Sequence, residues 1–110
     1  MTGENKPRRD KVLSMLGLAA RSRNVVSGGF ATENAVKSGK AYLVIIAEDA
    51  SDNTKKKFRN MCEFYEVPYY QYGEMEIVGH SMGKQDRTSL AVTDEGFANS
   101  IRKHLEDSKQ

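Results

Sequence analysis

The sequence predicts an α/β sandwich, in which helices cover both faces of one mostly parallel sheet. Amphipathic segments and short apolar runs alternate along the 110 residues in the order α-β-α-β-α-β-α-β-α, which is typical of this class. The run Tyr42–Ala47 is apolar without alternation, as expected for a strand buried on both faces. A chain of this length forms one domain and can bury a core without disulfides or metals.

Apolar residues at helical spacing predict five helices. They are expected at residues 8–20, 29–38, 53–65, 74–82 and from 95 to about 105. The 53–65 segment gives the clearest signal, because Phe58, Cys62 and Tyr65 recur on one helical face. Gly39 follows the second helix, where glycine favours the left-handed conformation that ends helices.

Four strands are expected between these helices, at residues 25–26, 42–47, 67–72 and 89–93. The polar ends of the chain fall outside this pattern. We therefore expect a flexible basic arm at residues 1–10, a single domain at 11–105 and a polar tail at 106–110.

Charge is distributed unevenly along the chain. Residues 1–40 hold eight Lys/Arg and three Asp/Glu, a net charge of +5. Residues 41–110 hold nine Lys/Arg and twelve Asp/Glu, a net charge of −3. Such asymmetry favours a polyanionic partner. A solvated basic arm would give the same charge, so charge alone leaves both interpretations open.

Composition indicates a cytoplasmic protein without membrane association. The longest apolar run is far shorter than the roughly 18 residues of a membrane span. No apolar stretch follows the charges of the polar N-terminus, so it is not a secretory signal. The only cysteine, Cys62, allows no internal disulfide and fits a reducing compartment.

No motif in the chain indicates catalysis. The segment Gly79–Lys84 has three residues between its glycines, where a phosphate-binding P-loop needs four, and Gln85 replaces the metal-binding hydroxyl. His80, His104 and Cys62 lack metal-ligand spacing. Adjacent Glu48 and Asp49 point in different directions and make a poor acid/base pair. We expect a protein that is not an enzyme and uses no cofactor or metal.

The helix expected at 29–38 offers binding chemistry at its start. Its first backbone N–H groups, at Gly28 and Gly29, are free to meet a phosphate or a base edge. Phe30 falls on the polar face of this helix, opposite Ala35, and can stack on an unpaired base. The glycines can equally be turn residues, and the ring can equally fold over the preceding loop.

Cations lie near this helix start in the sequence. Arg21, Arg23 and Lys37 can meet phosphates. The polar loop at 83–89 precedes a strand and can close over the same end of the sheet. Lys55–Lys57 and Arg59 form a second basic cluster, for which a solvated helix face is the competing interpretation.

Several segments, taken in order, resemble one known family. They are Leu16–Arg21, Val26–Gly28, Ser38–Ala41, Leu43–Ser51, Asn53–Lys57, Val67–Pro68, Gly79–His80 with Gly83–Lys84, and Leu90–Val92. Together they resemble the L7Ae-type ribosomal protein family, the kink-turn RNA binders, and within it the bacterial YlxQ-like branch. The likeness covers about residues 11–105.

This resemblance implies the L30e-like fold, a three-layer α-β-α sandwich around a mixed, mostly parallel sheet of about four strands. It also implies RNA binding without catalysis, in the cytoplasm. In the family, RNA is held by the second helix start, the loop after the central strand and the loop before the last strand. With Arg21, the corresponding candidates here are Gly28, Gly29, Phe30, Glu33, Asn34, Lys37, Glu48, Asp49, Arg87, Thr88 and Ser89.

The second helix departs from the family pattern. Kink-turn binders carry an Asn-Glu pair, with a Lys three residues later, that read sheared G·A pairs and the backbone. An ungapped alignment places Phe30, Ala31 and Asn34 at those positions. Ser22-Arg23-Asn24 also replaces the Ala-Gly-Lys usual in the YlxQ-like branch, with Arg23 where a turn glycine is expected.

The sequence favours a monomeric, ribosome-associated protein that binds structured RNA, either rRNA or a kink-turn-like element. An alternative is a protein-binding adaptor on the same fold, with Phe30 as the anchor for its partner. A third hypothesis is an RNA-recognition subunit for an rRNA-modifying enzyme, which would need a separate catalytic partner.

Overall fold

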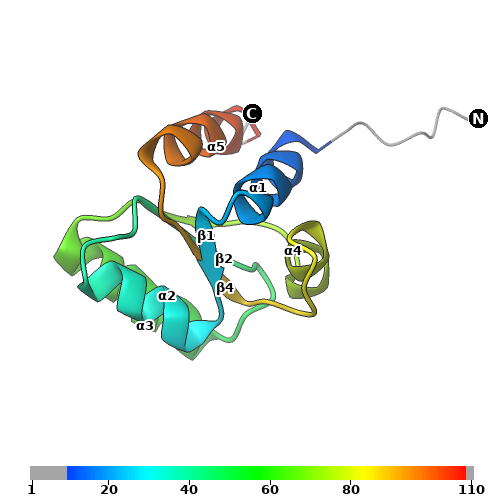
Figure 1. The fold of residues 1–110 in the computed structure, drawn as a ribbon. Helices are drawn as coiled ribbons and strands as arrows, with labels where there is room; N and C mark the ends of the chain where they lie inside the picture. Colours follow the sequence, from blue (N-terminus) through cyan, green and yellow to red (C-terminus); the bar gives the residue numbers. More distant parts are fainter. Residues whose placement is uncertain (1–9, 109–110) are drawn as a thin grey trace, which may run out of the picture.

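In the computed structural model, which describes residues 10–108, a four-stranded sheet separates two layers of helices (Figure 1). One layer contains α1 (Lys11–Arg21), α4 (Met75–Ser81) and α5 (Glu95–Asp107), and the other contains α2 (Gly29–Lys37) and α3 (Asp52–Tyr65). The strands are β1 (Val25–Ser27), β2 (Leu43–Ile46), β3 (Tyr69–Gln71) and β4 (Ser89–Val92). The predicted element order and three-layer sandwich are confirmed.

The strands lie in the order β1-β4-β2-β3. Only β2 and β3 pair in parallel, because β4 runs antiparallel to both of its neighbours. The sheet is mixed as expected, but the expectation of mostly parallel pairing is wrong. The cause is the segment before β4, which returns to the beginning of α4, where the Arg87 N–H donates to the Met75 carbonyl at 3.0 Å. Strand β4 therefore starts at the end of the sheet where β3 finishes.

Strand β2 divides the hydrophobic core into two clusters. Leu43 and Ile45 face α1, α4 and α5, while Val44 and Ile46 face α2 and α3. All four side chains are at most 1% exposed. The prediction of a strand buried on both faces is confirmed, and the backbone of β2 is held between β4 and β3.

Two domain boundaries differ from the prediction. Asp10 belongs to the fold, because its carboxylate accepts from the Leu13 N–H at 3.0 Å and caps α1. Helix α5 continues to Asp107, with Ser108 as its C-cap, two residues beyond the predicted end. The rest of the expected basic arm, residues 1–9, and residues 109–110 of the expected tail lie outside the described residues. Within residues 10–108, no helix is long and apolar enough to cross a membrane.

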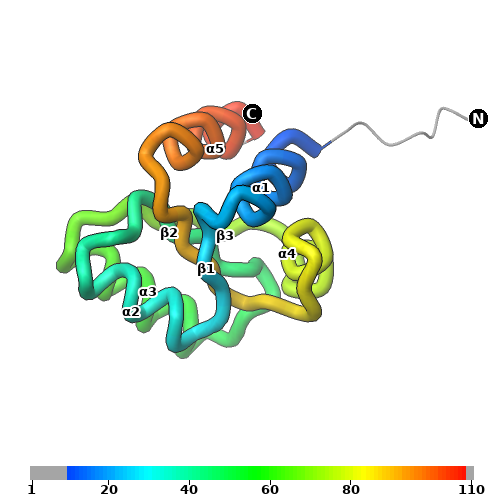
Figure 2. The backbone as a smooth tube through the Cα atoms, viewed as in Figure 1, coloured from blue at the N-terminus to red at the C-terminus, as the bar shows by residue number. Residues whose placement is uncertain are grey.

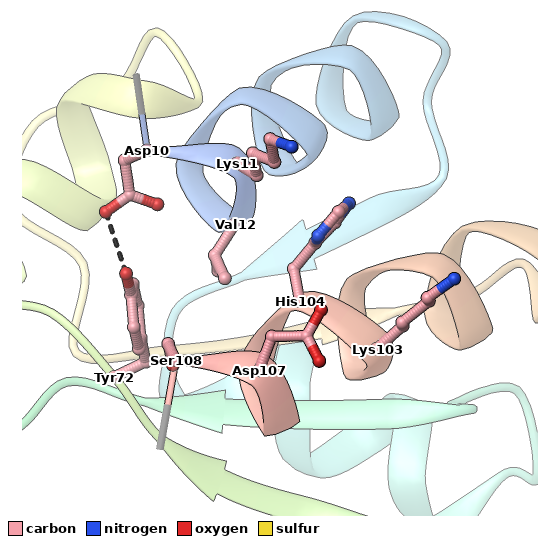
Figure 3. Close-up of a pocket in the computed structure, with 8 residues that line it drawn as sticks. All are labelled: Asp10, Lys11, Val12, Tyr72, Lys103, His104, Asp107 and Ser108. Atoms are coloured by element: carbon pink, nitrogen blue, oxygen red, sulfur yellow. Dashed lines mark hydrogen bonds between the residues drawn. The ribbon is translucent and has the colours of Figure 1, made fainter. Parts of the chain in front are cut away.

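A hydrogen bond between distant residues holds the beginning of α1. The Tyr72 hydroxyl donates to Asp10 Oδ2 at 2.7 Å, beside a pocket between the start of α1 and the end of α5 (Figure 3). Desolvation, with the bond to Asp10, raises the pKa of Tyr72 to about 12. Lysine and aspartate side chains both line this pocket, so it has no marked preference for an anion.

Cys62 is a core residue, as its place on the apolar face of α3 predicts. It is 1% exposed and forms no disulfide. Burial raises the pKa of the Cys62 thiol to about 11. The group is therefore a neutral thiol in the folded protein under physiological conditions, and a thiol in that state is a poor nucleophile.

We predict that the free energy of unfolding falls as the pH rises from about 9 to about 11. The Cys62 thiol ionises near 9 when exposed and near 11 when folded, so over this interval the unfolded chain binds fewer protons. Tyr72 extends the loss toward pH 12. Urea unfolding between pH 8 and 11 measures the effect. Cys62→Ala should flatten the loss between pH 9 and 10, and a wild-type stability independent of pH would contradict the account.

Candidate nucleic-acid interface

The carboxyl ends of β1, β2 and β3 and the amino end of β4 meet along one rim of the sheet (Figure 1). Backbone hydrogen bonds tie the rim together. The Gly28 N–H donates to the Ser89 carbonyl and the Ala47 N–H to the Thr88 carbonyl, each at 2.9 Å. The Glu48 N–H donates to the Gly73 carbonyl at 2.6 Å. The segments at 28–37, 48–49 and 86–89, which the family resemblance named together as candidates, thus meet at one rim.

The two glycines at the start of α2 have different roles. The Gly28 N–H donates to the Ser89 carbonyl, so the expectation that it is free to meet a ligand is wrong. Gly28 is the N-cap, with φ 96° and ψ 154°, a conformation available essentially only to glycine. Gly29 begins the helix, and a Cβ added there would meet nothing within 4 Å. No side chain caps α2. Its first N–H groups therefore retain hydrogen-bonding capacity and the positive end of the helix dipole.

Phe30 projects from the first turn of α2 and is 87% exposed. The predicted polar face is confirmed by Asn34, which is also exposed one turn later. Such exposure excludes the alternative in which the ring folds over the preceding loop. An unburied phenylalanine next to free backbone donors is a suitable platform for a planar ligand.

The Glu33 carboxylate forms ion pairs with two lysines, one on α2 and one on α3. The carboxylate lies 2.7 Å from Lys37 Nζ and 3.0 Å from Lys57 Nζ of α3. Hydrogen bonds from Lys37 and then Lys57 lower the pKa of Glu33, and the bond to Glu33 raises the pKa of Lys37. Lys37 is thus partly neutralised. In the sequence Lys57 belongs to a separate basic cluster, because α2 and α3 are neighbours only in the folded chain.

Asp49 has a structural role at the rim. Its Oδ1 accepts from the Met75 N–H at 2.8 Å and thereby caps α4, whose own N-cap residue, Glu74, makes no side-chain hydrogen bond. Glu48 beside it is exposed. Asp49 therefore stabilises the rim as a hydrogen-bond acceptor.

The segment before β4 contributes two partly exposed side chains, Arg87 and Thr88, and β4 begins with the buried Ser89. Arg87 Nε donates to Ser27 Oγ at 2.9 Å, and Nη1 donates to the Asp86 carbonyl at 3.0 Å. Thr88 is half-buried. Ser89 is 1% exposed, so the expectation that its side chain contacts a ligand is corrected. Because it lies on the central sheet, its contribution is the carbonyl that holds Gly28.

Arg21 lies apart from the start of α2. It is exposed in the last turn of α1 and lines a groove beside β1 with Arg23 and Lys84. Both arginines are among the phosphate ligands expected from the sequence, whereas Lys84 is not. Across residues 10–108, no three His, Cys, Asp or Glu side chains gather in a way that could hold a metal ion.

The sequence matches the model of a known protein family. The model of the ribosomal protein L7Ae/L30e/S12e/Gadd45 family matches residues 10–102. The chain belongs to this family. The match covers the whole rim and every described helix and strand up to most of α5.

Two curated relatives are bacterial proteins named RNA-binding protein YlxQ. The chain is 45% identical to the one from Bacillus subtilis over 87 residues, which cover 79% of this chain and 87% of the relative. It is 35% identical to the one from Enterococcus faecium over 103 residues, which cover 93% of this chain and 98% of the relative. These matches place the chain beside YlxQ, as the resemblance implied.

Solved structures show the same fold. A Bacillus halodurans protein of unknown function superposes with a TM-score of 0.87 at 36% identity, covering 89% of this chain and 99% of that one. A Giardia lamblia 15.5kD RNA binding protein superposes with a TM-score of 0.75 at 20% identity, covering 99% of this chain and 98% of that one. The second likeness concerns the fold alone.

We predict that Gly28→Ala lowers the free energy of unfolding by about 1–3 kcal/mol, because alanine is strained at this φ and ψ. Gly29→Ala is the matched control. It lies in a helix with open space around it and should stabilise the protein by about 0.5–1 kcal/mol. Urea unfolding of the two variants measures the difference. Equal stabilities would show that the turn at Gly28 does not require glycine.

Proposed function

We propose that this protein is a monomeric, non-catalytic RNA-binding protein of the bacterial cytoplasm, which holds structured RNA at the rim described above. The family membership and the names of the YlxQ relatives support RNA as the partner. The observation that carries the proposal is Phe30, 87% exposed beside the uncapped start of α2. One short segment thus offers a stacking surface and backbone donors together.

The two kinds of group suit the two parts of a nucleotide. Free N–H groups at a helix start favour a phosphate oxygen, because they donate hydrogen bonds at the positive end of the helix dipole. An exposed aromatic ring suits an unpaired base, since every base has a face on which a ring can stack. The open space at Gly29 lets an RNA strand approach the protein backbone closely.

The residues on α2 indicate what kind of RNA is bound. Phe30, Ala31 and Asn34 stand where kink-turn binders carry Asn, Glu and Lys. A phenylalanine cannot donate or accept the hydrogen bonds that read a base edge. We therefore propose that a splayed base in a structured element, of rRNA or of a kink-turn-like motif, stacks on Phe30. Ribosome association follows if that element is ribosomal.

We predict that Phe30→Ala lowers the affinity for RNA by roughly five- to a hundredfold, since stacking of one base on an aromatic side chain contributes about 1–3 kcal/mol. Stability should not change, because the ring is exposed. Gel shifts at physiological salt against rRNA fragments and kink-turn RNA measure the loss. Phe64→Ala is the matched control, because Phe64 is 78% exposed near the end of α3.

The same titrations test the proposal against its alternative. A wild-type protein that binds none of these RNAs in a salt-sensitive manner would contradict RNA binding. An unchanged affinity of Phe30→Ala would remove Phe30 from the interface. A protein partner that resists RNase and is lost in Phe30→Ala would favour the adaptor hypothesis.

A further inference from the structure

A groove of about 400 Å³ follows β1, the strand at one edge of the sheet. Its walls come from the end of α1 and the segment after α4, and its floor is partly apolar, with Val25 and Met82. Three cations line it: Arg21, Arg23 and Lys84. No acidic side chain is among the lining residues. The groove ends at Ser27, where the rim begins.

A close helix contact places Arg21 in the groove. A Cβ added at Gly17 would lie 2.8 Å from the Ser81 carbonyl oxygen, so α1 and α4 touch at this glycine. Arg21 follows Gly17 by four residues and therefore lies on the same face of α1. Arg21 Nη1 lies 3.5 Å from the same Cβ position, so its guanidinium sits at the contact between α1 and α4, and the residue also lines the groove.

Close packing at a second glycine, Gly79, fixes the position of the Lys84 backbone. A Cβ at Gly79 would lie 1.8 Å from the Gln85 carbonyl oxygen, and the Lys84 N–H donates to the Gly79 carbonyl at 2.8 Å. Gly83 makes the turn between them with φ 73°. The segment Gly79–Lys84, which fails as a P-loop, is thus a tightly packed helix end that holds a lysine beside β1.

Arg23 occupies an unfavourable backbone conformation. Its φ is 66°, in the left-handed region that glycine occupies freely. The Arg23 N–H donates to the Ala20 carbonyl at 3.0 Å and the Asn24 N–H to the Ala19 carbonyl at 2.7 Å. This is the turn that commonly ends helices on a glycine. Arg23 thus has a side chain at a position where glycine would be unstrained, and this side chain lines the groove.

The charges in the groove are available for a ligand. Among the described residues, neither Arg21, Arg23 nor Lys84 forms an ion pair. All three are exposed. Lys37 and Lys57, by contrast, share Glu33. The groove therefore holds three exposed cations without an ion pair, whereas Lys37 on α2 is paired with Glu33.

We propose that this groove binds the phosphate backbone of the RNA strand as it leaves the rim. The inference rests on the proposed function. Strand β1 spans three residues, about 10 Å, so the groove beside it can accommodate a short stretch of one RNA strand. Arginine suits this role because its planar fork can donate two hydrogen bonds to one phosphate. Continuity with the rim at Ser27 favours RNA over an acidic peptide as the occupant.

The variant Arg23→Gly tests the groove without damaging the fold. It should lower RNA affinity by about three- to tenfold at physiological salt and reduce the slope of log affinity against log salt by about one unit. Its unfolding midpoint should be equal or higher, because glycine relieves the strained φ. A residue needed only for structure would show the opposite pattern.

Glu66→Gly is the matched control. Glu66 is the other described non-glycine residue with positive φ, at 60°, and it ends α3. This variant should gain similar stability with unchanged RNA affinity and salt slope. Lys84→Ala should reproduce the loss of affinity seen in Arg23→Gly, because both cations line the groove.

The outcomes distinguish RNA binding in the groove from RNA binding at the rim. Normal binding by Arg23→Gly and Lys84→Ala, with weakened binding by Phe30→Ala, would overturn the groove proposal and leave the proposed function intact. A wild-type protein that binds none of the rRNA fragments or kink-turn RNA would overturn both. Poly-glutamate binding that Arg23→Gly abolishes, with RNA affinity unchanged, would assign the groove to an acidic peptide instead.

Discussion

The candidate interface depends on the turn at Gly28. Its φ of 96° redirects the chain from β1 into α2, and its N–H holds the Ser89 carbonyl at 2.9 Å. One residue thereby fixes the edge strand, the start of a helix and the entry to β4 relative to one another. Any side chain at this position would strain the turn. The uncapped helix start and the exposed Phe30 have a fixed direction because the turn does.

The antiparallel direction of β4 determines which segments meet at the candidate interface. If the sheet had been fully parallel, the loop before β4 would lie at the opposite end of the strands. Because β4 runs the other way, Arg87 is within hydrogen-bond distance of Ser27 on β1. The chain runs from α1 through β1 to α2 (Figure 2), and the groove along β1 includes Ser27, to which Arg87 of the rim donates a hydrogen bond. Among the described residues, Arg21, Arg23 and Lys84 in that groove form no ion pair, whereas Lys37 on α2 and Lys57 on α3 share Glu33.

Much of the fold follows from local pattern. The buried run at β2, the apolar face of α3 and the glycine after α2 each predict their element, and Phe30 is on the exposed face as expected. The direction of β4 could not be predicted, because it depends on where a short helix returns the chain. The roles of Asp49 and Ser89 depend on contacts with Met75 and Gly28 across the sheet edge. Lys84 was missed because its proximity to Arg23 arises from packing at Gly17 and Gly79, and no sequence spacing records it.

The most direct test of the account is an NMR titration of the ¹⁵N-labelled protein with the tightest-binding RNA fragment. The account predicts that the amide signals of Gly28, Gly29 and Phe30 shift most, that those of Arg23, Lys84 and Arg87 shift with them, and that Tyr42 and Phe64 remain unchanged. Shifts concentrated at Tyr42 and Phe64, with the Gly28–Phe30 signals unmoved, would contradict it and place the RNA elsewhere on the fold.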